Sequence, residues 1–285
     1  MVFNRPASLT GEPVIIPCGQ CIGCRLERSR QWAIRCMHEK ASHKYSYFLT
    51  FTYDNDSVPS DMSLRKSDMQ KMWKRLRKRV GRFRYYMCGE YGERTSRPHY
   101  HALLFGIPLT DLTFYKNNKR GERLYRSKFL DEVWKLGFVT VGEVTFESAA
   151  YVSGYICDKV TGPNADEHYS YVDADGLIHS RLPEYTDMSR RPGIGRLYFD
   201  KNQAQIYHHD SVVMRGLEMK PPKYYDVLRE EIDPASMSVL KSVRRKKARL
   251  ILKKEKALET KWGVPRKHVN HIVALERHKS RSSDL

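Results

Sequence analysis

The chain has no long hydrophobic run and few cysteines for its 285 residues. No apolar stretch approaches the ~18 residues that a membrane-spanning helix needs, so we expect no membrane partner. Residues 1–6 lack the apolar core of a secretory signal peptide. Six cysteines in a chain of this length do not make a disulfide framework. Without an export signal, we therefore expect a reducing cytoplasm.

Acidic residues are also scarce, and the resulting positive charge is concentrated in two places. The chain has 51 Lys and Arg against 33 Asp and Glu, for a net charge of +18. Residues 64–84 contain ten basic residues and one acid, and residues 241–285 contain fifteen and four. A basic tail can serve solubility alone, but two separate basic stretches favour a polyanionic partner, most commonly nucleic acid.

The pattern of apolar residues predicts an α+β protein with a central antiparallel sheet, flanking helices and a basic helical C-terminal tail. The expected strands cover residues 45–53, 83–88, 98–105 and 137–144. The expected helices cover residues 25–44, 67–80, 128–136, 148–159 and about 235–262. The polar residues 108–127 read as a loop.

These elements predict three parts of the chain. Residues 1–44 form an N-terminal segment with cysteines and a helix, residues 45–215 form the domain that contains the sheet, and residues 216–285 form the basic helical region.

Two histidines, His99 and His101, flank one apolar residue in a segment that is expected to be a strand. Successive strand residues point to opposite faces, so both imidazoles share one face while Tyr100 enters the core. Two imidazoles side by side make half of a divalent metal site. A solvent-facing polar side of a strand is the alternative explanation, and the pair alone does not decide.

Tyr151, Tyr155 and Lys159 recur every four residues in the last of these expected helices before the tail. On a helix they line one face. A tyrosine hydroxyl can act as a nucleophile, but its ordinary pKa near 10 requires activation by a cation. The alternative is a pair of packed tyrosines and a solvated lysine.

Taken in order, a Thr-rich strand, the two-histidine strand and the two-tyrosine helix resemble the HUH endonucleases that initiate rolling-circle DNA replication. In these initiators the histidines precede the tyrosine, and two tyrosines resemble those of small circular single-stranded DNA phages. Residues 17–25, 89–92, 97–101 and 189–195 are similar to the replication initiators of gokushoviruses in the Microviridae. The resemblance covers about residues 17–200 and implies a Rep-type nuclease fold with RRM-like topology.

The resemblance implies a third metal ligand from the strand beside the histidines. Glu90 is the first choice and Glu93 is the second. Two imidazoles and one carboxylate with open positions suit Mg²⁺ or Mn²⁺, which would act as a Lewis acid on a phosphate.

The implied activity is that of a site-specific DNA endonuclease that also rejoins strands. One tyrosine would attack the phage origin, form a 5′-phosphotyrosyl link and free a 3′-OH, and the second would help to release a single-stranded circle. Lys159 would stabilise phosphate charge or a phenolate. The implied partners are single-stranded or supercoiled viral DNA at the origin and the host helicase and polymerase, in the bacterial cytoplasm. The alternatives are a non-catalytic nucleic-acid-binding protein and a plasmid initiator or transposase with the same chemistry.

Three cysteines with the spacing CxxCxxC, Cys18, Cys21 and Cys24, raise a separate question. Three close thiolates could bind Zn²⁺. The alternative is a cluster of reduced cysteines under the sheet. The candidates for a fourth zinc ligand are Cys36, His38 and His43.

Overall fold

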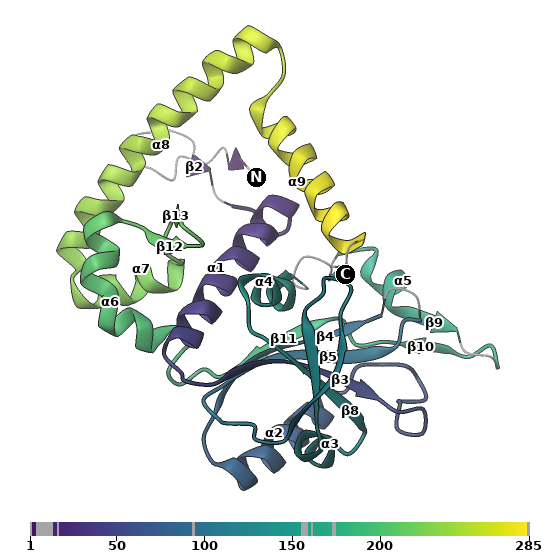
Figure 1. The fold of residues 1–285 in the computed structure, drawn as a ribbon. Coiled ribbons are helices and arrows are strands. Elements are labelled where there is room, and N and C mark those ends of the chain that lie inside the picture. Colours follow the sequence, from purple (N-terminus) through teal and green to yellow (C-terminus); the bar gives the residue numbers. More distant parts are fainter. Residues whose placement is uncertain are drawn as a thin grey trace. The chain divides into compact units, whose positions relative to one another are not determined.

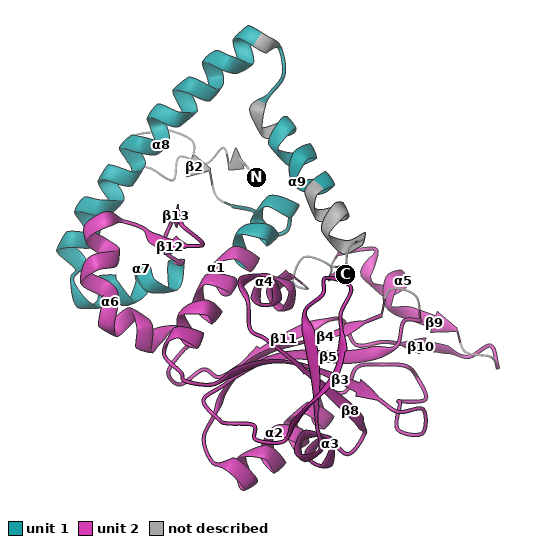
Figure 2. Ribbon diagram, in the orientation of Figure 1, with its two compact units in different colours: residues 1–28, 223–285 teal, residues 29–222 magenta. Residues whose placement is uncertain are grey.

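The structure is a computed structural model that describes residues 2–3, 14–15, 17–92, 95–154, 159–160, 162–172 and 175–283 (Figure 1). The chain divides into two compact units, residues 29–222 and residues 1–28 together with 223–285 (Figure 2). Helix α1 (Ile22–Ala41) contributes residues to both. The division after residues 44 and 215 stays a prediction.

An antiparallel sheet of seven strands, in the order β11-β4-β5-β3-β8-β7-β6, organises residues 29–222. The predicted α+β class is therefore confirmed. The strands are β3 (Ser46–Tyr53), β4 (Arg84–Tyr91), β5 (Pro98–Phe105), β6 (Leu112–Asn117), β7 (Arg123–Ser127), β8 (Gly137–Gly142) and β11 (Tyr185–Met188). The helices are α2 (Lys66–Val80), α3 (Lys128–Trp134), α4 (Phe146–Gly154), α5 (Ala165–Tyr169) and α6 (Arg196–His209), besides α1. Two small hairpins pair β9 (Ser170–Val172) with β10 (Ile178–Ser180) and β12 (Val212–Met214) with β13 (Leu217–Met219).

The centre of this unit has RRM-like topology. Along the chain the elements run β3-α2-β4-β5-α3-β8, and in the sheet the four strands lie in the order β4-β5-β3-β8. The β6–β7 hairpin is inserted between β5 and α3, where the sequence predicted a loop. That prediction was wrong because β6 is exposed along most of its length and lacks the alternation of a half-buried strand.

One face of the sheet packs against α2 and α3 and carries an aromatic core. Phe51, Trp73, Tyr100 and Trp134 are buried there, and the Trp73 indole N–H points at the sulfur of Met87 at 3.3 Å. Tyr100 enters this core from between two histidines that face the other way, because strand residues alternate. The predicted division of this segment is confirmed.

The opposite face packs against α1 and α4 through a smaller core. Cys36 of α1 and Val152 of α4 lie buried against Tyr86, Leu103 and other residues of β4 and β5. This smaller core leaves the outer part of β4 and β5 available for polar side chains.

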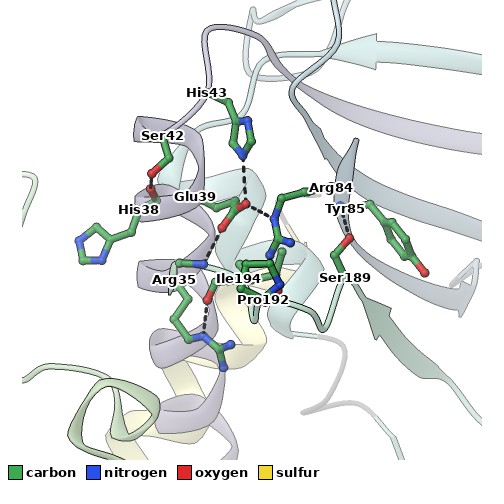
Figure 3. Close-up of polar contacts among 11 residues, drawn as sticks. Arg35, His38, Glu39, Ser42, His43, Arg84, Tyr85, Ser189, Pro192 and Ile194 are labelled. Atoms are coloured by element: carbon green, nitrogen blue, oxygen red, sulfur yellow. Dashed lines mark hydrogen bonds and ion pairs between the residues drawn. The ribbon is translucent and has the colours of Figure 1, made fainter. Parts of the chain in front are cut away.

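A buried carboxylate joins α1 to the segment 189–195 (Figure 3). Glu39 forms an ion pair with Arg84, lies 3.0 Å from His43 Nε2, and accepts a hydrogen bond from the backbone N–H of Gly195 at 2.6 Å. Arg84 also donates to the carbonyl of Pro192 at 2.7 Å. Burial raises the pKa of Glu39, but hydrogen bonds from His43, Gly195 and Arg84 outweigh it and hold the pKa below its ordinary value.

The second unit contains a helical C-terminal region and a short N-terminal hairpin. Its elements are β1 (Val2–Phe3), β2 (Val14–Ile15), α7 (Lys223–Ile232), α8 (Pro234–Trp262) and α9 (Arg266–Ser283). Asp233 caps α8 by accepting the N–H of Ser236, and Arg244 pairs with Asp226 of α7 at 2.8 Å. Across the described part of the chain, no helix has the length and apolarity needed to cross a membrane.

Candidate active site

The register of β4 against β5 brings Glu90 and the two histidines together. Glu90 lies directly opposite His99, and Cys88 lies opposite His101, so all four side chains share the face that carries α1 and α4. One carboxylate oxygen, Glu90 Oε1, lies 2.5 Å from His99 Nε2 and 2.8 Å from His101 Nε2. Strand β4 runs further than predicted, to Tyr91, which places Glu90 inside the sheet.

The other nitrogen of each ring is held by a partner that orients it. His99 Nδ1 lies 3.1 Å from the carbonyl of Arg97, which can only accept, so Nδ1 carries the proton. His101 Nδ1 lies 2.9 Å from the hydroxyl of Thr50, its direct neighbour on β3. Phe48 stacks on the His101 ring at 5.3 Å. Such partners of the distal nitrogen are typical of histidines that bind metals.

Burial and mutual contact shift the ionisation of all three groups. Burial raises the pKa of Glu90, but the charge and hydrogen bonds of His101 and His99 lower it below its ordinary value. Burial lowers the pKa of His99, but its contacts with Glu90 and Arg97 raise it overall. Burial dominates at His101, whose pKa is lowered. A carboxylate facing two imidazoles is therefore the charge state that this environment favours.

The three side chains fit a divalent metal ion. Their ligand atoms all lie within 4.8 Å of one another. The second carboxylate oxygen, Glu90 Oε2, is buried and has no hydrogen-bond partner among the described residues. A buried oxygen without a partner costs free energy, which a bound cation would recover. Two imidazoles and a carboxylate suit Mg²⁺ or Mn²⁺.

Helix α4 brings Tyr151 to the same cluster. Its hydroxyl donates to Glu90 Oε1 at 3.2 Å, and its ring lies 5.1 Å from that of His101. Ser148 and Thr145 cap each other's backbone N–H groups at the start of the helix, at 2.9 and 3.1 Å. The structure thus joins the predicted nucleophile to the predicted metal ligands.

Other predicted residues are not brought into the cluster. Tyr155 and Glu93 lie outside the described residues. The helix expected over 148–159 ends at Gly154, and Lys159 lies in no helix or strand. The four-residue spacing therefore does not place Lys159 beside Tyr151.

Glycine at position 89 permits the close packing behind Glu90. A Cβ atom there would lie 2.9 Å from the ring of Tyr185, 3.0 Å from Leu64 and 3.1 Å from the ring of Tyr100. These distances are too short for a carbon contact. A residue without a side chain is needed on the core side of β4 at this point.

The three N-terminal cysteines form a separate cluster before and within the first turn of α1. Their sulfur atoms lie within 4.8 Å of one another. Hydrogen bonds from the backbone N–H groups of Cys21 and Gln20 lower the pKa of Cys18 to about 6. Cys21 is exposed and Cys18 and Cys24 are half-buried, so they are not the packed core cysteines of the alternative interpretation.

None of the predicted fourth zinc ligands joins these cysteines in the described residues. Cys36 lies twelve residues beyond Cys24 on the same helix, about 18 Å away at 1.5 Å per residue. It is buried in the smaller core. His38 stacks on Tyr198 at 3.8 Å, and His43 contacts Glu39. The helix geometry therefore excludes the predicted four-ligand set.

Sequence reasoning missed Thr50, Phe48 and Arg97 as partners of the histidines. The signal for the first two was present, because Phe48, Thr50 and Thr52 alternate along one strand and so share one face. Their opposition to His101 and His99 depends on the register, which the sequence alone does not reveal.

Comparison with known proteins agrees with this arrangement. The family model of the replication-associated protein ORF2 matches residues 46–160. Replication-associated protein ORF2 of Spiroplasma virus 4 is 31% identical over 281 residues, which covers 90% of this chain and 83% of the relative. Replication-associated protein VP4 of Bdellovibrio phage phiMH2K is 32% identical over 219 residues, which covers 73% of this chain and 65% of the relative.

A third relative, replication-associated protein ORF4 of Chlamydia phage 1, is 31% identical over 232 residues, covering 78% of this chain and 55% of the relative. No solved structure matches the chain. The predicted resemblance to phage replication proteins is confirmed. Because the matched family region contains the histidine strand and the relative from Spiroplasma virus 4 is covered over most of its length, this chain belongs to the ORF2 family of replication-associated proteins.

Proposed function

We propose that this protein initiates rolling-circle replication of a phage genome by nicking the origin. The observation that carries the proposal is the hydrogen bond from the Tyr151 hydroxyl to the Glu90 oxygen that both histidines share. A nucleophile and a set of metal ligands then meet at one carboxylate. The names of the relatives support a role in replication.

Tyr151 is the proposed first nucleophile. Mg²⁺ or Mn²⁺ held by Glu90, His99 and His101 would act as a Lewis acid on the scissile phosphate. The Tyr151 oxygen forms a bond to phosphorus and loses its proton, while the bond from phosphorus to the 3′ oxygen breaks and that oxygen takes up a proton. The products are a 5′-phosphotyrosyl link and a free 3′-OH. Glu90 orients the attacking hydroxyl by accepting its hydrogen bond.

Tyr155 is the proposed second nucleophile, which attacks the regenerated origin after one round. The newly released 3′-OH then attacks the first phosphotyrosyl link and closes a single-stranded circle. Lys159 is proposed to stabilise the phosphate charge. Host helicase and polymerase are the proposed partners in the bacterial cytoplasm, because a free 3′-OH serves as a primer.

The proposal is tested with supercoiled phage DNA that carries the origin. In Mn²⁺ the wild-type protein nicks it and becomes linked to the 5′ end, and His99→Ala does neither. His208→Ala, an exposed histidine on α6, is the matched control and keeps the activity. If the wild type retards DNA on a gel without cutting it, a non-catalytic binding protein is the better description.

The cysteine cluster supports a second proposal, that Cys18, Cys21 and Cys24 bind Zn²⁺ as thiolates. Three sulfurs within 4.8 Å of one another carry it. Mass spectrometry of the intact, natively purified protein should find one Zn²⁺ that is lost in Cys21→Ser and kept in Cys36→Ala. Equal zinc content in both variants would contradict this assignment.

A further inference from the structure

The sheet face that holds the metal ligands continues beyond them across three more strands. In the register, His101 lies opposite Thr50, Thr50 opposite Thr140, and Thr140 opposite Arg126. One step along, His99 lies opposite Thr52 and Thr52 opposite Phe138. Directly opposed residues of antiparallel strands point to the same side. A row of side chains therefore leads from the metal ligands on β5 to β7, about 14 Å at the usual strand spacing.

This part of the face is outside both hydrophobic cores. Thr52, Phe138, Thr140 and Arg126 are all half-buried, and none belongs to the core under α2 and α3 or to the core under α1 and α4. Phe138 is a large apolar ring that is not packed into either core. Such a ring at the surface, beside polar groups, calls for a ligand that has both an apolar face and hydrogen-bonding edges.

The row ends in a stack of rings and one guanidinium group. The Arg126 guanidinium carbon lies 4.8 Å from the Phe138 ring centre and 5.7 Å from that of Tyr115, which is 46% exposed on β6. Asp131 holds Arg126 through Nη2 at 2.7 Å, and its other oxygen accepts the N–H of Val139. Arg126 Nε has no hydrogen-bond partner among the described residues. The stack is thus fixed in place and retains donor capacity.

The hairpin that carries this stack is also basic. Residues 112–127 contain five Lys and Arg and one Glu, and Lys116 lies 5.3 Å from the Tyr115 ring. Exposed aromatic rings among basic residues are typical of surfaces that bind single strands, because each base has a face to stack and each phosphate a charge to neutralise. A duplex hides the faces of its bases, so it does not fit this surface.

We infer that Thr52, Phe138, Thr140, Arg126 and Tyr115, here called the sheet track, bind the single-stranded DNA that adjoins the scissile phosphate. Bases stack on Phe138 and Tyr115, and the hairpin lysines and arginines contact phosphates. The inference rests on the proposed function, because the metal ligands fix where the phosphate lies. The basic residues of α2 do not share this surface, since α2 packs on the opposite face.

The hairpin offers a matched control for this inference. Phe114 is 61% exposed and adjoins Tyr115, but it pairs with Tyr125, whose ring packs against the core of the opposite face. Phe114 and Tyr115 therefore test the two faces of one hairpin with the same loss of an exposed ring.

The experiment measures fluorescence anisotropy of a labelled oligothymidylate of about 20 nucleotides and of a duplex of equal length. The full-length protein carries Tyr151→Phe and no divalent metal is added, so binding is measured without cleavage. Tyr115→Ala and Phe138→Ala should each weaken single-strand binding about tenfold. Phe114→Ala should change it less than about twofold, and duplex binding should change little in any variant.

Equal losses in Tyr115→Ala and Phe114→Ala, or equal losses on single strand and duplex, would overturn the inference. Phe138→Leu keeps apolar volume without the ring, and it tests stacking even where Phe138→Ala fails to fold. Nicking by the parent protein with Tyr151 intact is measured in parallel. Nicking without a role for Tyr115 defeats the sheet track alone, and a role for Tyr115 without nicking defeats the nuclease proposal alone.

Discussion

The two faces of the same sheet differ in what they bury. The face under α2 and α3 is filled by rings, including Phe51, Trp73 and Trp134. The face under α1 and α4 buries a carboxylate and two imidazoles beside a tyrosine hydroxyl. Alternation along β5 sends Tyr100 to one face and His99 and His101 to the other. Stability and chemistry are thus assigned to alternate residues of one strand.

Polar groups on the second face are costly to bury, and their partners offset that cost. Thr50, Arg97 and Glu90 each satisfy a ring nitrogen. Glu90 Oε2 remains without a described partner. We therefore expect substitutions on this face to change activity more than stability, and substitutions on the other face to do the reverse.

The largest expected effect comes from the nucleophile. Tyr151→Phe should slow the first covalent linkage to DNA about a thousandfold or more, because the attacking oxygen is gone. Its free energy of unfolding should change by about 1 kcal/mol or less, since one hydrogen bond is lost. The rate is measured from the appearance of the protein–DNA band on denaturing gels, with Tyr171→Phe as control. An unchanged rate would move the first attack away from Tyr151.

Trp134→Ala should have the opposite profile. Its ring is buried among Phe51, Tyr53 and Tyr100, and its N–H donates to the carbonyl of Thr52 at 3.1 Å. The loss of this ring should lower the free energy of unfolding by about 3–5 kcal/mol, as measured by urea denaturation. Phe114→Ala removes an exposed ring and should cost far less. Equal costs for the two would break the contrast between core and surface.

Metal binding should stabilise the second face by a smaller amount. Mn²⁺ at about a hundred times its dissociation constant adds about 2.7 kcal/mol to a protein that binds it only when folded. The wild type and His208→Ala should therefore melt at a higher temperature with Mn²⁺, and a variant with both His99→Ala and His101→Ala should not. The same shift in all three proteins would place the ion elsewhere.

The smallest expected effect depends on pH and lies away from both cores. Glu39→Gln should lower the free energy of unfolding by about 2 kcal/mol at neutral pH, because a charged acceptor is lost. The pKa of Glu39 is held below its ordinary 4.5 in the folded protein, so its stabilising effect is present above that pH and is lost as the pH falls further. Denaturation of both proteins from pH 7 to 3 should show the difference shrinking. A difference that grew on acidification would contradict this assignment.

Much of the fold and part of the site could be predicted because their signals are local. The alternation in β3 and β5 predicted both strands and the common face of His99 and His101. The β6–β7 hairpin escaped prediction because an edge strand exposed to solvent carries no alternation. Contacts such as Glu39 with Arg84, 45 residues apart, and Thr50 with His101, 51 residues apart, depend on tertiary register, which no short pattern encodes.

The most direct test of the central claim identifies the atom that becomes linked to DNA. The wild-type protein is incubated with origin DNA and Mn²⁺, digested with nuclease and trypsin, and its peptides are sequenced by mass spectrometry. We predict a nucleotide joined through its 5′ phosphate to Tyr151, absent when Mn²⁺ is omitted. A nicked DNA with a free 5′ phosphate and no modified tyrosine would contradict the proposal.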